Sequence, residues 1–388
     1  MGLGIYIQVP FCQTKCTYCN FHTGVVSTAK FQPYVDAVVT EIRNHRALYA
    51  AAGLPSAEMD FEAAAETIYI GGGTPSLLDP AELQKLLDAV RVTFALPWKE
   101  VTLEADPETI DLPKARAWTQ AGINRVSLGV QSFSDRELTA AGRMHRREDI
   151  LRAVPVLREA GIENFSFDLI AGLPHQTEES WKSSVEELLQ LSPQHVSIYM
   201  LEVDEGSRLG KEILQGGARY GAAQVPSDDA IADFYEYACL ALAAPGYRHY
   251  EISNWALPGR ESGHNLKYWR RETYLGFGAG AHSFSNGVRW ANAHDSASYV
   301  ASIGRGTLPL EQKEVLTPRM ALEEELFLGL RQLDGIDIAA IERSYGVDLT
   351  RRLETLRAGG LVEFQGSQVR LAPDRLSISN EVFVELMG

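Results

Sequence analysis

Near its N-terminus the chain carries three closely spaced cysteines within residues 6–21, which read YIQVPFCQTKCTYCNF. Cys12, Cys16 and Cys19 follow the pattern C-x3-C-x2-C. They lie too close together for a useful disulfide framework, and a structural zinc ion usually takes four protein ligands. Thiolates are the soft ligands that iron–sulfur clusters select. The spacing therefore predicts a [4Fe–4S] cluster with one iron open to an exchangeable ligand. Small buried thiols or a partial zinc site are the alternatives.

Length and composition are those of an ordinary globular protein. The chain has 388 residues, of which 45% are hydrophobic and 22% charged, so we expect two or three domains. No apolar run approaches the roughly 20 residues that a membrane span needs, and no secretory signal is evident. The one further cysteine, Cys239, is expected in the core of a helix. So few cysteines fit a reducing compartment, and we expect a cytoplasmic protein.

The net charge of −15 argues against a broad nucleic-acid surface, so no nucleic-acid partner is expected. A local basic pocket is still compatible with it. Residues 143–147 read RMHRR, the most basic run of this region. This run is expected to be either a solvated helix end or a loop that binds carboxylates.

Strand and helix signals alternate through the first two-thirds of the chain, which implies a parallel sheet. Six such units in about 200 residues predict an α/β fold, an open partial (β/α)6 barrel whose active site lies at the carboxyl ends of the strands. The predicted strands are 5–9, 67–70, 101–104, 125–130, 165–169 and 195–200, and the predicted helices are 31–52, 80–94, 112–120, 134–141, 148–160 and 178–191.

Residues suited to chemistry follow five of these strands. The three cysteines follow the first strand, and Gly71-Gly72-Gly73-Thr74-Pro75 follows the second. Glu104 ends the third strand, Gln131 follows the fourth and Asp168 lies late in the fifth. Glycines let the backbone come close to a ligand, and the carboxylates can accept hydrogen bonds from one. We expect these residues to meet at one edge of the barrel, although a lone glycine triplet is often a tight turn and an isolated acid is often a helix cap.

The remaining chain differs in character. Residues 201–310 are less regular, with one helix near 228–244. Beyond residue 317, three helices near 319–332, 337–344 and 348–358 precede two short strands, 361–364 and 368–371. This pattern predicts a small winged-helix-like module that packs on the barrel or covers it. We therefore predict domains at 1–205, 206–310 and 311–388.

Residues 264–269, HNLKYW, place a histidine among aromatic side chains. His264 is expected to be either a hydrogen-bonded structural residue or an axial ligand of a planar macrocycle. The glycine-rich segment 276–283, GFGAGAHS, is a weak nucleotide fingerprint. It is expected instead to close the barrel near the cofactor.

Taken together, these segments resemble the HemN-like radical S-adenosylmethionine (radical SAM) family along essentially the whole chain, and most closely its haem-chaperone branch. The resemblance rests on residues 6–21, 71–75, 104–107, 129–132, 168–174, 264–269 and 276–283. It implies a radical SAM barrel with a HemN-type C-terminal domain. It also implies a [4Fe–4S] cluster on Cys12, Cys16 and Cys19, with SAM on the open iron.

By the same resemblance, His264 is implicated in binding haem, which is held and passed to respiratory haem enzymes, often at the membrane. A homodimer and a peripheral association with the membrane are compatible with the family. The positions that match its SAM contacts are Tyr6, Tyr18, Gly72, Gly73, Thr74, Glu104, Gln131, Arg143 and Asp168.

Two other activities of this family stay open as alternatives. The oxygen-independent coproporphyrinogen III dehydrogenases have a further cysteine two residues after the third, where this chain has Phe21, and a longer segment before the cluster. A radical SAM methyltransferase is the third candidate, which the run at His264 does not support. The family commonly has histidine where this chain has Gln8, a departure within the cofactor pocket.

Overall fold

A twelve-stranded sheet forms the frame of the molecule in the computed structural model, which describes residues 2–54 and 64–387. Six parallel strands make its centre and lie side by side in chain order, β1 to β6. Buried branched residues such as Ile5, Ile68 and Val126 fill these strands, as expected for a sheet covered on its outer face. The six strands are β1 (Leu3–Val9), β2 (Ala65–Gly72), β3 (Glu100–Ala105), β4 (Arg125–Gln131), β5 (Phe165–Ala171) and β6 (His195–Met200).

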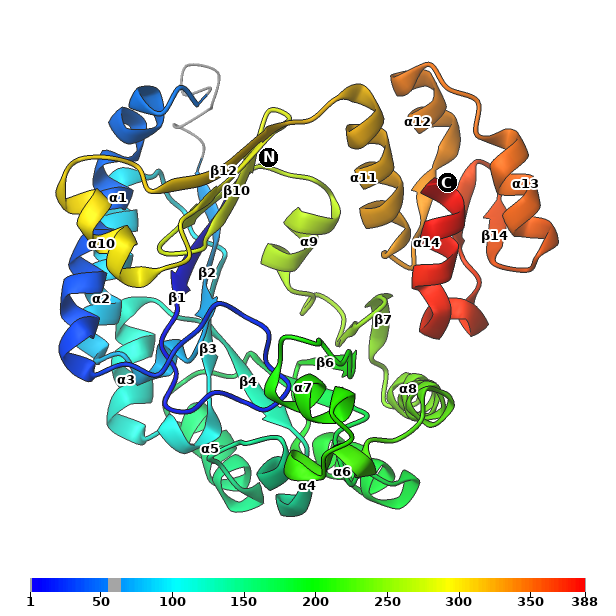
Figure 1. The fold of residues 1–388 in the computed structure, drawn as a ribbon, viewed down its shortest axis with the longest axis horizontal. Helices are drawn as coiled ribbons and strands as arrows, with labels where there is room; N and C mark the ends of the chain where they lie inside the picture. The colour runs from blue at the N-terminus through cyan, green and yellow to red at the C-terminus, as the bar shows by residue number, and fades with distance from the viewer. Residues whose placement is uncertain (1, 55–63, 388) are drawn as a thin grey trace.

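Amphipathic helices cover the outside of this central sheet (Figure 1). They begin where the sequence provides caps. Asp79 accepts a hydrogen bond from the Ala81 amide, and Glu82 accepts one from the Asp79 amide, which closes a capping box at the start of α2. The helices are α1 (Phe31–Ala51), α2 (Pro80–Thr93), α3 (Leu112–Ala121), α4 (Asp135–Ala140), α5 (Arg147–Glu159) and α6 (Glu178–Leu191).

The region from 201 to 310 extends the sheet at both edges. Strand β9 (Tyr274–Phe277) pairs in parallel with β1, and antiparallel strands β10 (His282–Ser285), β11 (Val288–Asn292) and β12 (Leu310–Val315) follow it outward. At the other edge, β8 (Asn254–Ala256) and β7 (Arg248–Glu251) continue from β6. The helices here are α7 (Arg208–Leu214), α8 (Asp228–Ala243), α9 (Gly263–Trp269) and α10 (Ser296–Gly304). Only α8 was predicted from the sequence.

The C-terminal module stands beside the sheet, next to α9 (Figure 1). It contains the three predicted helices, a fourth helix and a three-stranded antiparallel sheet in the order β13-β15-β14. Its elements are α11 (Pro318–Leu330), β13 (Ile336–Asp337), α12 (Ile338–Tyr345), α13 (Thr350–Ala358), β14 (Val362–Gln365), β15 (Gln368–Leu371) and α14 (Ser379–Met387). The predicted fold class, a partial α/β barrel with a C-terminal α+β module, is confirmed. The domain boundaries stay a prediction; β12 spans the one placed after residue 310.

A buried carboxylate fastens helix α1 to the far edge of the sheet. Glu41 is 0% exposed and accepts hydrogen bonds from the Gly278 amide at 2.9 Å, Asn292 Nδ2 at 2.7 Å and the Tyr299 hydroxyl at 2.5 Å. Burial raises its pKa to about 7, against the lowering effect of these three donors. We call Glu41, Gly278, Asn292 and Tyr299 the Glu41 junction. It holds the glycine-rich segment 276–283 against α1 and β1, and none of that segment lines the cavity described below.

In the part of the chain that the structure describes, no helix is both long and apolar enough to cross a membrane.

Candidate functional site

A cavity of about 620 Å³ opens at the carboxyl ends of the central strands and continues into the barrel lumen. Residues of β2 to β6 form its walls, and the loop that follows β1 lies over its mouth. Arg331, Ser379 and Asn380, from the ends of α11 and α14, add the C-terminal module to its lining. The position is that expected for a site in a barrel of parallel strands.

The cysteine loop (residues 10–24) is closed on itself and anchored at its centre. The Cys12 amide donates to the Gly24 carbonyl at 3.0 Å, and the Gly24 amide donates to the Pro10 carbonyl at 2.9 Å. Thr17 is buried, and its amide and hydroxyl donate to the carbonyls at the end of α4. Cys12, Cys16 and Cys19 are unpaired, partly exposed and line the cavity. Tyr18 lines it too and packs against buried Ala141, Ile170 and Leu173.

The glycine turn after β2 packs directly under this loop. The Gly73 amide donates to the Val9 carbonyl at 2.8 Å, and the Thr74 amide donates to the Phe11 carbonyl at 2.7 Å. A Cβ atom on Gly73 would lie 2.4 Å from the Phe11 carbonyl oxygen, and one on Gly72 would lie 2.5 Å from the Gln8 side chain. Gly72 also has a φ of +116°, which favours glycine. The turn therefore needs glycine at both positions to bring β2 against the cysteine loop.

Glu104 lies at the centre of the cavity wall with both oxygens engaged. Its Oε2 accepts from the Gly72 amide at 2.8 Å, and its Oε1 accepts from the Tyr69 hydroxyl at 2.9 Å. Burial raises the pKa of Glu104 to about 7, and these two donors oppose the shift. A ligand that carries positive charge would favour the ionised carboxylate here.

Arg143 joins the cysteine loop to the strand ends. Its Nη1 donates to Cys16 Sγ at 3.3 Å, its Nη2 donates to the Gly129 carbonyl at 2.9 Å, and it forms an ion pair with Asp106. Thr74 Oγ1 donates to the same Asp106 carboxylate at 3.2 Å. The residues of the predicted basic run therefore lie in two environments. Arg143 faces the cavity, whereas Arg147 pairs with Glu187 on the surface.

Gln131 and Asp168 complete the wall on β4 and β5. Gln131 has a φ of 65°, a left-handed conformation that is uncommon for a residue with a side chain and concentrates at functional sites. Asp168 accepts hydrogen bonds from the hydroxyls of Ser127 and Ser166, and burial raises its pKa. Both residues line the cavity with Glu104 and Arg143.

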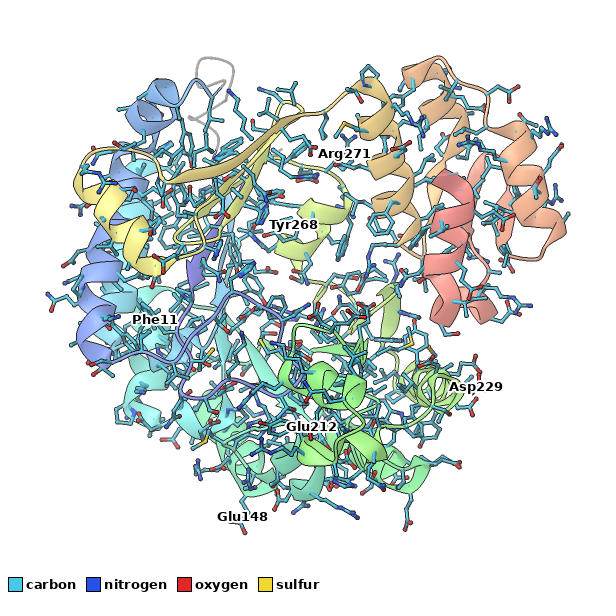
Figure 2. The ribbon with its side chains drawn as sticks, viewed as in Figure 1. Phe11, Glu148, Glu212, Asp229, Tyr268 and Arg271 are labelled. Carbon is cyan, nitrogen blue, oxygen red and sulfur yellow. The ribbon has the colours of Figure 1, made fainter. Side chains whose placement is uncertain are left out.

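Tyr6 and His264 are the two predicted site residues that do not line the cavity. The Tyr6 hydroxyl donates to Gln8 Oε1 at 2.6 Å, and its ring stacks on Tyr69. His264 is 1% exposed and lies at the start of α9. Its hydrogen-bond partner Tyr268, on the same helix, is labelled in Figure 2. His264 Nδ1 pairs with the Thr67 hydroxyl and its Nε2 with the Tyr268 hydroxyl, both at 2.9 Å.

Several lining residues were not predicted from the sequence. Asp106 falls within the segment 104–107 but is not itself a predicted site residue, and Arg331 lies beyond the barrel. Arg125 and His195 begin β4 and β6, deep in the lumen. The available signal was the alternation along β4, where Arg125, Ser127, Gly129 and Gln131 share one face and all line the cavity.

The donor set fits an iron–sulfur cluster better than a single metal ion. Among the described residues, no group of three or more His, Cys, Asp or Glu side chains is arranged around one ion. Three free thiols on one loop, around one cavity, suit a cluster in which each thiolate takes a different iron.

Two known protein families match this chain, one in its N-terminal half and one near its C-terminus. The family described as the radical SAM superfamily matches residues 6–188, and the HemN C-terminal domain matches residues 316–374. Membership of the first implies a [4Fe–4S] cluster and SAM, in agreement with the donor set at the mouth of the cavity.

Curated relatives match over nearly the full length. The heme chaperone HemW of Bacillus subtilis is 34% identical over 389 residues, which cover 99% of this chain and 98% of that protein. The heme chaperone HemW of Synechocystis is 35% identical over 390 residues, which cover 97% and 90%.

Among solved structures, coproporphyrinogen III oxidase (HemN) from Escherichia coli superposes with a TM-score of 0.83. The match covers 99% of this chain and 90% of that one at 23% identity, so it bears on the fold alone. The full-length identity to the curated relatives decides the assignment: the chain belongs to the HemW family of heme chaperones within the radical SAM superfamily.

Proposed function

We propose that this protein is a haem chaperone, which holds a [4Fe–4S] cluster with SAM, binds haem and transfers it to acceptor proteins. The observation that carries the proposal is the 34% identity to a heme chaperone over 99% of this chain and 98% of the relative. Transfer to respiratory haem enzymes, a homodimer and peripheral contact with a membrane belong to the same proposal.

Cys12, Cys16 and Cys19 are the proposed cluster ligands. Their loop is fixed at Thr17 and at the Pro10–Gly24 closure, so the three thiols are held together at the mouth before any ligand binds. Arg143 lies within hydrogen-bond distance of Cys16 Sγ and places a positive charge beside the proposed ligands. When bound, the cluster supplies an electron that can cleave SAM to a carbon radical.

The proposed SAM site lies beside these thiols. SAM carries an ammonium, a sulfonium, ribose hydroxyls and a carboxylate, and the cavity wall offers a partner for each kind of group. Glu104 and Asp168 supply carboxylates for positive charge and hydroxyls, and Gln131 and Arg143 supply donors for a carboxylate or an adenine edge. Gly72, Gly73 and Thr74 form the backbone rim on which the ligand lies, Tyr18 packs beside it, and Tyr6 supports the wall from behind Tyr69.

His264 is the proposed haem ligand, and its surroundings define what binding requires. Burial lowers its pKa to about 3, so the ring is neutral, which is the form that coordinates iron. Both ring nitrogens already have hydrogen-bond partners, Thr67 and Tyr268. Coordination through Nε2 therefore requires the Tyr268 hydroxyl to move away, with Thr67 still fixing Nδ1.

A haem titration on one anaerobically reconstituted preparation tests the proposal. We expect the cluster-loaded protein to bind haem, His264→Ala to lose at least tenfold in affinity with a changed haem absorption band, and the matched variant Tyr268→Phe to bind as well as the wild type or better. Transfer of the bound haem to an apo-haem protein should follow. A cluster-loaded protein that binds no haem would refute the chaperone function, and unchanged haem binding by His264→Ala would exclude that residue alone.

The same preparation tests the alternative enzymatic activity. With coproporphyrinogen III, SAM and a reductant, a dehydrogenase would form protoporphyrinogen IX. We expect no such product, because Phe21 stands where family dehydrogenases have a fourth nearby cysteine, and its side chain is 67% exposed at the mouth. Turnover of the porphyrinogen would overturn this expectation.

A further inference from the structure

Arg125 is a buried cation that forms no ion pair or side-chain hydrogen bond within the described residues, although its charge opposes the rise that burial causes in the pKa of Asp168. It begins β4, is 2% exposed and lines the cavity. Its Nε is buried without a hydrogen-bond partner, and no ion pair or hydrogen bond joins its guanidinium to any other residue in the described ranges. Burying an unpaired charge is unfavourable by several kcal/mol. A residue kept under these conditions calls for an explanation other than fold stability.

The position of Arg125 separates it from the site at the mouth. Alternate residues of β4 line the cavity, from Gln131 at the mouth to Arg125 at the start of the strand. Six residues of strand span about 20 Å at about 3.3 Å per residue. Arg125 therefore lies at the deep end of the cavity, far below Arg143 and the cysteine loop. We call Arg125 and His195, which both lie there, the lumen floor.

The acidic groups nearest to Arg125 in the lumen are already committed elsewhere. Asp168 is held by the hydroxyls of Ser127 and Ser166, and Glu104 by the Gly72 amide and Tyr69. His195 pairs through Nδ1 with the Ser166 hydroxyl and through Nε2 with the Tyr250 hydroxyl. The floor thus presents a fixed positive charge, and in the part of the chain that the structure describes no carboxylate lies at ion-pair distance from it, although Asp168 is near enough to feel the charge.

We propose that the lumen floor is a second anion subsite, in which Arg125 binds a carboxylate of a ligand that enters through the mouth. A guanidinium offers paired N–H donors that match a carboxylate, and a buried setting strengthens the contact. This inference rests on the proposed function for its ligand, because haem carries two propionates, whereas SAM is expected on the open iron beside the cysteine loop. Arg125 would then position a propionate of a haem held at His264, a residue whose pKa the charge of Arg125 helps to lower.

The wild-type full-length protein, cluster-loaded under anaerobic conditions, provides a test that needs no variant. Haem and haem dimethyl ester differ only in their carboxylates, and SAM serves as a control ligand that binds at the mouth. Preference for haem over its dimethyl ester is necessary for the proposal. If both bind equally, the proposal is wrong.

Variants then assign the preference to Arg125. Arg125→Met removes the charge at similar length and is expected to weaken haem binding by about tenfold or more, with no change for haem dimethyl ester or for SAM. Arg125→Lys, which keeps the charge without the paired donors, should lie between. Equal binding of haem by Arg125→Met and the wild type, or an equal loss for haem and its ester, overturns the proposal.

Unfolding measurements separate this role from a structural one. Because Arg125→Met breaks no hydrogen bond or ion pair within the described residues and loses only the longer-range attraction to Asp168, it should unfold close to the wild-type temperature. A much lower unfolding temperature together with equal weakening of haem and its ester would show a structural residue and refute the subsite. If the wild type binds neither haem nor its ester, the chaperone function fails and the subsite with it, whereas haem binding that is unchanged in Arg125→Met refutes the subsite alone.

Discussion

The Glu41 junction and the lumen floor each bury a charged side chain, and they treat it in opposite ways. Glu41 is 0% exposed and receives three hydrogen bonds from separate segments of the chain. Arg125 is 2% exposed and forms no ion pair or side-chain hydrogen bond within the described residues, and Asp168 feels its charge only at longer range. A buried charge that is saturated by its own chain fastens elements together. A buried charge left without a protein partner beside a cavity marks a place where a ligand binds.

The difference has an energetic consequence that can be measured. Removing one member of a buried, hydrogen-bonded network strands its partners and is strongly destabilising. Replacing an unpaired buried charge by an apolar side chain strands nothing. Variants at the junction should therefore lower stability and leave ligand binding intact. Variants around the cavity should weaken ligand binding and leave stability nearly unchanged.

The largest effect is expected at the mouth of the cavity. Cys16→Ala removes one of the three proposed cluster ligands, so iron and sulfide content and the visible absorption of the reconstituted protein should fall to background. The unfolding free energy of the cluster-free protein should change by less than about 1 kcal/mol, because Cys16 is partly exposed on a loop. The matched control is Cys239→Ala on α8, which should load a normal cluster. Destabilisation of the cluster-free Cys16→Ala protein by several kcal/mol would break the contrast with the junction.

The junction itself should give the next largest effect. Glu41→Ala leaves the Gly278 amide, the Asn292 amide and the Tyr299 hydroxyl without their acceptor, and should lower the free energy of unfolding by about 3–5 kcal/mol. Denaturant unfolding measures the loss. Cluster content per folded molecule should stay at the wild-type level, and a selective loss of the cluster would contradict a purely structural role.

The pH dependence of stability gives a second test of the Glu41 junction. Glu41 has a pKa of about 7 in the folded protein, raised by burial from an ordinary value of 4.5. Between these values the folded state keeps a proton that the unfolded chain releases, so stability falls as pH rises from about 4.5 to 7, by up to about 3 kcal/mol from this group. Glu104 and Glu108 are shifted similarly, so the measurement is the difference from Glu41→Gln. An equal pH dependence in wild type and Glu41→Gln would rule out this assignment.

Much of the fold could be predicted because the central units are long and periodic. The strand at 67–70 and the helix at 178–191, for example, are found at 65–72 and 178–191. The region from 201 to 310 could not be predicted in the same way. Its strands are three to six residues long and depend on partners elsewhere in the chain, such as β9 on β1. A short pattern does not specify a partner that distant.

The candidate site also has one part that the sequence predicts and another that it does not. Cys16 and Gly73 follow β1 and β2, and Glu104 and Gln131 lie at the carboxyl ends of β3 and β4, so parallel topology alone brings their positions to one edge. Their roles as ligands stay predictions. Arg125 was missed because it begins its strand, where the rule about carboxyl ends gives no reason to look. The hydrogen bond between His264 and Thr67 was beyond reach as well, because 197 residues separate the two.

Tyr34 tests how independent the two regions are, with the smallest expected effect. Its hydroxyl donates to the Gln8 carbonyl at 2.8 Å, two residues before the cysteine loop begins, and accepts from the Ala279 amide at 2.9 Å, next to the Glu41 junction. Tyr34→Phe removes both of these hydrogen bonds and should lower the free energy of unfolding by about 1–2 kcal/mol.

Because the loop after Gln8 has its own closure between Pro10 and Gly24, cluster content and SAM affinity of Tyr34→Phe should equal those of the wild type. Cluster absorption and anaerobic SAM titration on the purified variant measure both. If cluster content falls along with stability, the strand end transmits strain from the junction to the thiols. The saturated carboxylate would then serve the site as well as the fold, and the sharp division between the two kinds of buried charge would no longer hold for this molecule.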